Sequence, residues 1–450
     1  MKVCKFGGTS LASAEQIIKV CDIITSDPER RLAVVSAPGK RTKEDIKVTD
    51  LLISCADKYI KTGEAVEEMN AVIKRFDDIA KDLGLDSNIT DIIAEDMKKR
   101  LSGPVTHEGM FMDLLKAAGE DNSAKIVAAY LKSKGHEAQY VNPKDAGLFL
   151  SDEFGNARVL PESFDNLKAL NNYKGIIIFP GFFGYSKAGE VVTFPRGGSD
   201  ITGSILAAAV CADVYENFTD VDSVFAANPN IVPDAKAISV FTYREMRELS
   251  YAGFSVLHEE TLEPVYRKGI PVCIKNTNNP EAPGTMIVKE RSQNGDIVAG
   301  IAGDVGFSTL YISKYMMNRE VGFGRKVLQI LEEQGLSYEH VPSGIDNMSV
   351  VVRTKQLTDE KEKLVIKRIK DELAVDDIEI VPNLALVMVV GEGMRHTVGL
   401  AARATNALAA VGVNVEMINQ GSSEVSMMFG VRSSECETAI KVLYREFFNV

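Results

Sequence analysis

The chain has 450 residues, of which 45% are hydrophobic and 25% are charged, and its formal net charge is −12. This length predicts two or three domains, and the composition is average for a soluble globular protein. The acidic balance argues against nucleic acid or an anionic membrane as a partner, because both bind through a basic face. The six cysteines form no Cys-x-x-Cys pair, the five histidines are dispersed, and we find no signal peptide or membrane-length apolar run. We therefore expect a cytoplasmic protein with reduced thiols and no transition-metal site.

The first element along the chain is a short apolar strand that ends in Lys5-Phe6-Gly7-Gly8-Thr9-Ser10. An amphipathic helix follows, and Ser13 and Gln16 have the spacing of a capping box at its start. A strand, a glycine turn and a helix start often hold a phosphate, because glycines allow close approach and free N–H groups face the anion. Lys5 supplies a positive charge just before the turn. Such turns also occur without a ligand, so this motif alone leaves both interpretations open.

Strands and helices alternate from there to about residue 290. Helical periodicity dominates residues 51–131, and residues 190–194 are predicted to form a short antiparallel strand before an alanine-rich helix. Apolar runs predict buried strands over residues 31–36 and 174–179, and further strands are predicted over residues 137–141 and 214–218. This pattern predicts one α/β domain over residues 1–292, with a mostly parallel sheet between helices.

Clusters of glycine, hydroxyl and charged residues follow several of these strands. They occupy residues 5–10, 36–39, 180–184, 196–200 and 219–222. Because ligands bind at the carboxyl ends of parallel strands, we expect the clusters to meet in one crevice. Ordinary capping is an equal alternative for any single cluster, since Ser199 or Asp200 would serve as a cap for the alanine-rich helix. Five clusters together favour a ligand site.

The sequence after residue 292 contains an internal repeat. At a constant offset, Gly322, Leu331 and Gly335 match Gly399, Leu408 and Gly412. Each copy has the pattern of a β-α-β-β-α-β ferredoxin-like unit, so we expect two small domains over residues 293–380 and 381–450. A pair of such units suggests regulation of the first domain. A platform for dimerisation is the alternative.

Several of these segments together resemble the aspartokinase family. They are Lys5-Phe6-Gly7-Gly8-Thr9-Ser10, Arg196-Gly197-Gly198-Ser199-Asp200, Thr219-Asp220-Val221-Asp222 and Val256-Leu257-His258. The resemblance covers the whole chain, because this family carries two C-terminal ACT domains with the repeat pattern described above. It implies an amino-acid-kinase catalytic domain that uses ATP to phosphorylate the β-carboxylate of L-aspartate, the first step of lysine, threonine and methionine biosynthesis. We expect a monofunctional form without a dehydrogenase domain; the alternative is a non-catalytic amino-acid sensor built on an inactive kinase.

The resemblance also implies roles for individual residues. Lys5 would stabilise the transferring phosphoryl group, and Asp200 would orient Lys5 or contact Mg²⁺ through water. Arg196 would bind the α-carboxylate of aspartate and Glu120 its α-ammonium, within a substrate site of Ser36, Thr49, Glu120, Arg196, Gly197, Gly198 and Ser199. The nucleotide would contact Gly7, Gly8, Thr9, Ser10, Thr219, Asp220, Phe225, Asn230 and Ser255. Mg²⁺ would bind mainly through the nucleotide phosphates, with no direct protein ligand.

The chain departs from the family pattern on the nucleotide side. Asn230 and Ser255 stand where the family usually has cations that touch the ATP phosphates, and Pro195 precedes Arg196 where glycine is common. Lys5 and the substrate residues are intact. We therefore predict that catalysis survives, with a raised KM for ATP.

ACT units usually bind an amino-acid effector between paired units. The resemblance therefore implies a homodimer or a larger homo-oligomer, regulated by lysine, threonine or both. The candidate effector residues lie at a glycine turn and at a strand-end loop: Met317, Gly322, Phe323, Gly324, Ser343, Asp346 and Asn347. The alternative is that they are ordinary packing and turn residues.

Overall fold

The computed structural model describes all residues except 104, 255–256, 258, 292–295 and 449–450. The chain forms two compact units, which we describe separately. The first comprises Met1–Val224, Ala237–Arg247 and Ser255–Arg291, and the second comprises Phe225–Lys236, Glu248–Phe254 and Ser292–Val450.

An eight-stranded sheet organises the first unit, in the order β10-β12-β11-β7-β1-β2-β4-β3. The six strands from β11 to β3 run parallel, whereas β12 is antiparallel to β11 and β10 is parallel to β12. The predicted mostly parallel sheet is confirmed. The strands are β1 (Lys2–Phe6), β2 (Arg30–Val35), β3 (Ala138–Tyr140), β4 (Ile176–Pro180), β7 (Val214–Thr219), β10 (Val240–Thr242), β11 (Val272–Asn276) and β12 (Thr285–Val288).

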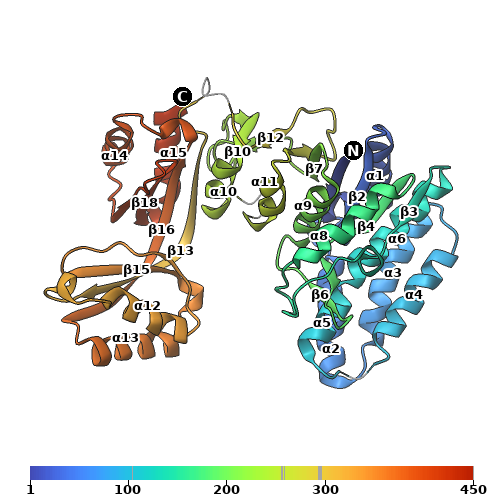
Figure 1. The fold of residues 1–450 in the computed structure, drawn as a ribbon, viewed down its shortest axis with the longest axis horizontal. Helices are drawn as coiled ribbons and strands as arrows, with labels where there is room; N and C mark the ends of the chain where they lie inside the picture. Colours follow the sequence, from blue (N-terminus) through green and yellow to red (C-terminus); the bar gives the residue numbers. More distant parts are fainter. Residues whose placement is uncertain (104, 255–256, 258, 292–295, 449–450) are drawn as a thin grey trace. The chain divides into compact units, whose positions relative to one another are not determined.

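Helices cover this sheet, which explains why β2 and β4 contain apolar runs rather than alternating patterns. Figure 1 shows the helices α2 to α6 grouped in blue and cyan. The helices are α1 (Ala14–Thr25), α2 (Val48–Thr62), α3 (Val66–Asp82), α4 (Asn88–Arg100), α5 (Glu108–Lys116), α6 (Ala118–Ser133), α7 (Pro143–Ala146), α8 (Pro161–Leu167), α9 (Gly198–Val210), α10 (Tyr243–Tyr251) and α11 (Glu263–Lys268). The short strands are β5 (Phe183–Tyr185), β6 (Val191–Thr193), β8 (Val224–Phe225) and β9 (Ala237–Ile238), and the residues of β8 and of α10 are divided between the two units. β5 and β6 pair antiparallel, which agrees with the antiparallel strand predicted over residues 190–194.

The alternation of side chains along β1 decides where Lys5 lies. Cys4 and Phe6 belong to a hydrophobic core with residues of α1 to α6. Val3 and Lys5 therefore fall on the opposite face, because successive strand residues point to opposite sides. The helix α9 packs against β1 and β7 and contributes no residue to that core. Lys5 is thus directed at α9.

The connection from β1 to α1 differs in one respect from the prediction. Ser13 caps α1 as expected, since its hydroxyl accepts a hydrogen bond from the backbone N–H of Gln16 at 3.4 Å. However, the glycine turn leads first into a 3-10 turn over Gly8–Leu11 and not directly into the α-helix. The backbone at the turn therefore belongs to a tighter and shorter element than the sequence indicated.

The second unit contains a six-stranded antiparallel sheet in the order β14-β15-β13-β16-β18-β17. Its strands are β13 (Gly300–Ser313), β14 (Tyr338–His340), β15 (Asn347–Arg353), β16 (Asp377–Val390), β17 (Met417–Asn419) and β18 (Ser426–Arg432). Its helices are α12 (Phe323–Glu333), α13 (Asp359–Leu373), α14 (Leu400–Ala410) and α15 (Cys436–Phe448). The two repeats give this sheet an internal symmetry.

The repeated glycines adopt the same conformations in both copies. Gly322 and Gly399 precede α12 and α14 with φ of 82° and 89°, and Gly335 and Gly412 follow those helices with φ of 63° and 75°. Only glycine adopts such a backbone readily, which explains why these positions match in the sequence.

The two repeats share their longest strands. Residues 307–313 of β13 pair with β15 and with residues 377–384 of β16, whereas residues 300–304 pair with residues 386–390 of β16. Each repeat obtains four strands in this way. The fourth strand of the second repeat comes from the start of β13.

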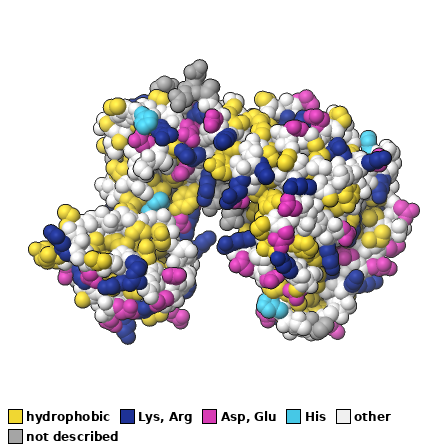
Figure 2. Space-filling view, viewed as in Figure 1, with side chains coloured by type: hydrophobic (Ala, Val, Ile, Leu, Met, Phe, Trp, Pro, Cys, Tyr) yellow, Lys and Arg dark blue, Asp and Glu magenta, His cyan; other side chains and the backbone are white. Residues whose placement is uncertain are grey.

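Surface and thiol properties complete the description. Acidic and basic side chains are interspersed on the face that Figure 2 shows. None of the helices in the described part of the chain is long and apolar enough to cross a membrane.

All six cysteines are free, and burial raises the pKa of the Cys55 and Cys436 thiols to about 11, which keeps them protonated at neutral pH.

Candidate active site

The strand-end clusters of the sequence meet at one edge of the first sheet. β4, β2, β1 and β7 are consecutive parallel strands, so their carboxyl ends lie side by side. Backbone hydrogen bonds join each following loop to a neighbouring strand: Gly7 N to Phe218 O (3.2 Å), Ser36 N to Phe6 O (3.2 Å) and Gly181 N to Val35 O (2.9 Å). The site is therefore built on the most central strands of the domain.

A buried ion pair between β1 and α9 lies at this edge. The ammonium of Lys5, a residue only 7% exposed, is 2.5 Å from Asp200 Oδ1. Asn217 of β7 connects both groups, because it donates to Asp200 Oδ1 at 2.9 Å and accepts from Lys5 Nζ at 3.4 Å. Asn217 was missed from the sequence, although two polar residues, Glu216 and Asn217, within a buried strand are a signal that would have found it.

The start of α9 is shaped by close packing and not by a side-chain cap. Gly197 precedes the helix with φ of 81°, and no side chain caps it, so the capping interpretation of Ser199 and Asp200 is wrong. A Cβ on Gly198 would lie 2.6 Å from the Phe182 ring. Arg196 is exposed, and it forms no ion pair with any described residue. Its guanidinium is available to a ligand.

Glu120 has the most unusual environment of the predicted substrate residues. It lies in α6, is 5% exposed, and its Oε2 has no hydrogen-bond partner. Burial raises the pKa of Glu120 to about 8. The Ala37 backbone N–H and the Lys116 ammonium act in the opposite direction and lower this pKa in part. A buried carboxyl with an unused oxygen is suited to receive a cationic group.

The glycine turn is held tightly against the loop after β2. Gly39 N donates to Gly8 O at 2.7 Å, and a Cβ on Gly8 would lie 2.9 Å from Ala37 O. Thr9 is exposed, whereas the Ser10 hydroxyl is buried and hydrogen-bonded to the Thr277 hydroxyl at 2.7 Å. The turn therefore offers backbone and Thr9, while the Ser10 side chain is engaged in the fold.

The remaining residues predicted to bind aspartate or the nucleotide lie in different parts of the structure. Ser36 and Thr49 are half-buried, the latter in the first turn of α2, and Thr219 donates to Asp220 at 3.2 Å. Phe225 and Asn230 belong to the second unit, and Ser255 lies outside the described residues.

The predicted effector residues belong to the first repeat of the second unit. Met317 and Phe323 are buried in the hydrophobic core of that repeat. Asp346 Oδ1 accepts from the Met316 backbone N–H at 2.8 Å, which joins the loop before β15 to the turn after β13. Gly322 and Gly324 lie at the start of α12, and Ser343 and Asn347 flank the turn that contains Asp346.

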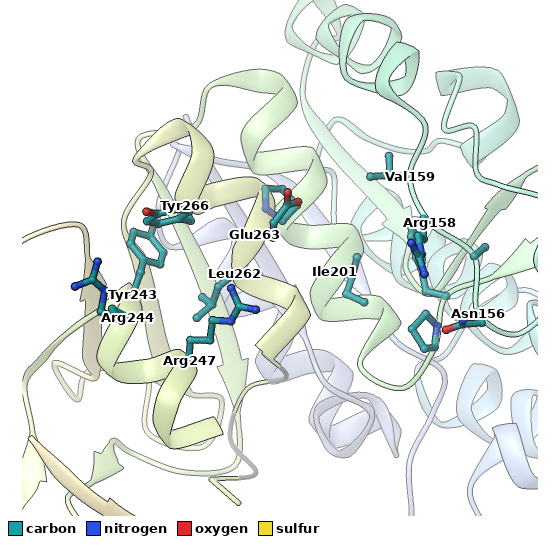
Figure 3. Close-up of a pocket in the computed structure, with 14 residues that line it drawn as sticks. Asn156, Arg158, Val159, Ile201, Tyr243, Arg244, Arg247, Leu262, Glu263 and Tyr266 are labelled. Carbon is teal, nitrogen blue, oxygen red and sulfur yellow. The ribbon is translucent and has the colours of Figure 1, made fainter. Parts of the chain in front are cut away.

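A separate cavity of about 720 Å³ lies in the first unit, next to the segment over residues 196–200, since Pro195 and Ile201 line it. Figure 3 shows Arg158 and Asn156 on one side of it, Arg247 and Leu262 on the other, and Ile201 between them. None of the predicted site residues lines this cavity. It lies outside the Lys5–Asp200 centre.

Comparison with known proteins identifies the family. Residues 1–276 match the amino acid kinase family, and residues 387–447 match an ACT domain. The chain is 58% identical to aspartokinase 3 of Bacillus subtilis over 448 residues, which span 100% of this chain and 99% of that protein. The chain belongs to the aspartokinase family.

Solved aspartokinase structures share the fold over almost the whole chain. The aspartate kinase of Clostridium acetobutylicum has a TM-score of 0.87 at 40% identity, covering 99% of this chain and 100% of that one. Aspartokinase III of E. coli in complex with aspartate and ADP has a TM-score of 0.80 at 25% identity, with 100% of both chains covered. The same enzyme with lysine and aspartate has a TM-score of 0.77 at 26% identity, covering 100% and 99%. The sequence-based assignment of the family and of its two-part fold is therefore confirmed.

Proposed function

We propose that this aspartokinase transfers the γ-phosphoryl group of ATP to the β-carboxylate of L-aspartate at the Lys5–Asp200 centre. A carboxylate oxygen of aspartate attacks the γ-phosphorus, the bond from that phosphorus to the bridging oxygen of ATP breaks, and ADP leaves. The carboxylate is already ionised at neutral pH, so the reaction needs no general base. Catalysis is then positioning and charge stabilisation. The observation that carries this proposal is the buried, pre-positioned ammonium of Lys5 beside a glycine turn.

Lys5 would neutralise charge on the transferring group. Its ammonium is held by Asp200 and Asn217 at the end of the central strand, so little reorganisation is needed when the phosphoryl group arrives. Asp200 is already engaged with Lys5. We therefore favour the orienting role for Asp200 over contact with Mg²⁺.

Two charged side chains would recognise aspartate by its α-carbon groups. The exposed guanidinium of Arg196 suits bidentate binding of the α-carboxylate. The unpartnered Oε2 of Glu120 would accept from the α-ammonium, with Ser36, Thr49 and Ser199 adding polar contacts. This arrangement leaves the β-carboxylate free to face Lys5.

The nucleotide would lie along the glycine turn, with its phosphates at Gly7, Gly8 and Thr9. The turn suits a phosphate because a Cβ on Gly7 would lie 3.7 Å from Lys5 Nζ, so that glycine keeps the space beside the ammonium free of a side chain. Among the described residues, no group of three His, Cys, Asp or Glu side chains is arranged to hold a metal ion. We propose that Mg²⁺ is carried mainly by the ATP phosphates, where it would supply charge neutralisation.

The ACT repeats would make the enzyme sensitive to an amino acid. The E. coli enzyme with lysine bound makes lysine the first effector to test, with threonine second. We place the repeats at residues 293–380 and 381–450, with residues 300–304 completing the sheet of the second. We also propose a homodimer or larger homo-oligomer in the cytoplasm, as ACT units pair to form effector sites.

An assay of ADP release tests this function. We expect ADP release that requires both ATP and L-aspartate, with no turnover when L-glutamate replaces aspartate. Folded protein that releases no ADP with aspartate would support the inactive-sensor alternative and overturn the proposal.

A further inference from the structure

A buried arginine connects the two loops that form the phosphate side of the site. Arg75 lies in α3 and is only 4% exposed. Its Nη2 donates to Gly39 O at 2.7 Å and to Ala12 O at 3.2 Å, and its Nη1 donates to Asp45 at 2.6 Å. One guanidinium therefore holds two backbone carbonyls and one carboxylate that come from two connections, the one between β1 and α1 and the one between β2 and α2.

The two carbonyls belong to the loops that meet at the glycine turn. Ala12 follows the turn that begins at Gly7, and Gly39 ends the loop that begins at Ser36. These loops touch through their backbones, because Gly39 N donates to Gly8 O at 2.7 Å. Arg75 binds the carbonyl of Gly39 while Gly39 binds the turn. The geometry of the turn therefore depends on a residue outside it.

We propose that Arg75 is a positioning residue for phosphoryl transfer, which sets the spacing between the glycine turn and the loop over residues 36–39. This inference rests on the proposed function of the site. Arg75 does not touch the reacting groups. It acts through the backbone N–H groups of the turn and through the position of Lys5, which immediately precedes the turn.

Arginine is needed here for its shape as well as its charge. A planar guanidinium presents several N–H donors in fixed directions, whereas a lysine ammonium at the end of a flexible stem does not reproduce that fork. Asp45 balances the buried charge. Hydrogen bonds from Arg41 and Arg75 hold the pKa of the Asp45 carboxyl well below its usual range, so Asp45 is ionised at working pH.

The same network supplies a matched control. Arg41 also donates to Asp45, at 3.0 Å, but it is exposed, and the hydrogen bonds of its guanidinium among the described residues go to Asp45 and to neither loop carbonyl. Arg41→Ala removes an arginine from Asp45 without removing the bonds to Gly39 and Ala12. Asp45→Asn weakens the anchor of Arg75 and leaves its carbonyl bonds in place.

The experiment compares the full-length protein with its Arg75→Lys, Arg75→Met, Asp45→Asn and Arg41→Ala variants. Each is measured for melting temperature, kcat, and KM for ATP and for L-aspartate, well below the melting temperature. We expect both Arg75 variants to lose about 10²-fold in kcat/KM for ATP, because a misplacement of about 1 Å is sufficient for such a loss. KM for aspartate should rise by a smaller factor, because Arg196 lies on another loop, although Ser36 and the Ala37 N–H beside Glu120 belong to the loop that Arg75 holds. Asp45→Asn should be intermediate and Arg41→Ala close to the unmodified protein.

Several outcomes would overturn the inference. Arg75→Lys with kcat/KM for ATP within threefold of Arg41→Ala would do so, as would equal losses toward ATP and aspartate. If both Arg75 variants fail to fold, the residue serves the stability of the domain and the positioning role is wrong. Failure of the proposed function is distinguishable, because the unmodified protein would then show no aspartate-dependent ADP release at all.

Discussion

The ammonium of Lys5 lies 2.5 Å from Asp200 Oδ1, and both side chains are largely buried. One group comes from the first strand of the chain and the other from the first turn of α9. The pair places a cation at the carboxyl end of the central strand before any substrate binds. Such preorganisation is what stabilisation of a transferring phosphoryl group requires.

The Lys5–Asp200 ion pair predicts how kcat compares between the two single variants and the double variant. Lys5→Ala should reduce kcat at least ~10²-fold, because the positive charge that faces the transferring phosphate is lost. Asp200→Asn should reduce kcat about 10-fold, and the double variant should be no worse than Lys5→Ala, since Asp200 acts through Lys5. Lys2→Ala is the control on the same strand, because Lys2 pairs with Asp27 away from the site. Fully additive losses in the double variant would show that Asp200 has its own contact with Mg²⁺ or substrate.

A second prediction concerns proton release on aspartate binding. Burial raises the pKa of Glu120 to about 8, so the free enzyme holds this carboxyl mostly protonated at pH 7. An α-ammonium next to Glu120 would favour the ionised form. Aspartate binding should therefore release close to one proton at pH 7 and almost none at pH 9.5. Calorimetry in two buffers with different ionisation enthalpies measures this number.

The raised pKa of Glu120 also predicts how the free energy of unfolding changes with pH. Its folded-state pKa lies above the ordinary value of 4.5, so the folded protein binds more protons than the unfolded chain between about pH 4.5 and 8. The contribution of Glu120 to the free energy of unfolding should fall as pH rises through this window, and Glu120→Gln should remove that slope. Proton release that is equal in Glu120→Gln and in the unmodified protein would assign the titration to another group.

A third prediction tests the contact between the two loops. A Cβ on Gly39 would lie 2.7 Å from the carbonyl carbon of Gly8, and the colliding atoms are backbone. Gly39→Ala should push the glycine turn away from the loop and lower kcat/KM for ATP about 10²-fold. Gly103→Ala is the matched control, because no heavy atom lies within 4 Å of its Cβ position. Full activity of Gly39→Ala would mean that the spacing of the loops is not critical.

A fourth prediction distinguishes the two ACT repeats. Asp346 binds the Met316 backbone N–H in the first repeat, and Glu424 binds the His396 backbone N–H at 2.8 Å in the second. If the first repeat holds the effector, Asp346→Ala should raise the lysine concentration for half-inhibition about 10-fold and leave uninhibited kcat unchanged. Glu424→Ala should leave inhibition as it is. The opposite pattern would assign the effector to the second repeat, and threonine should be tested in parallel.

Local patterns were sufficient to predict much of this molecule. Apolar runs predicted the parallel strands β2 and β4, whereas the parallel strand β11 was not predicted. The recurring glycines indicated the two repeats because each glycine needs a positive φ. The shared strand β13 was not predictable in the same way, since pairing between residues far apart in the chain leaves no local pattern. Arg75 was missed for a related reason. Two of its three partners are backbone carbonyls, which any residue provides.

The most direct measurement of the central claim is the trapping of the acyl phosphate. The protein is incubated with ATP, Mg²⁺, L-aspartate and hydroxylamine, and aspartyl hydroxamate is quantified. We predict hydroxamate in an amount equal to the ADP released, and at least ~10²-fold slower formation with Lys5→Ala. ADP release without hydroxamate, or hydroxamate formation at an unchanged rate by Lys5→Ala, would contradict phosphorylation of the β-carboxylate at the Lys5–Asp200 centre.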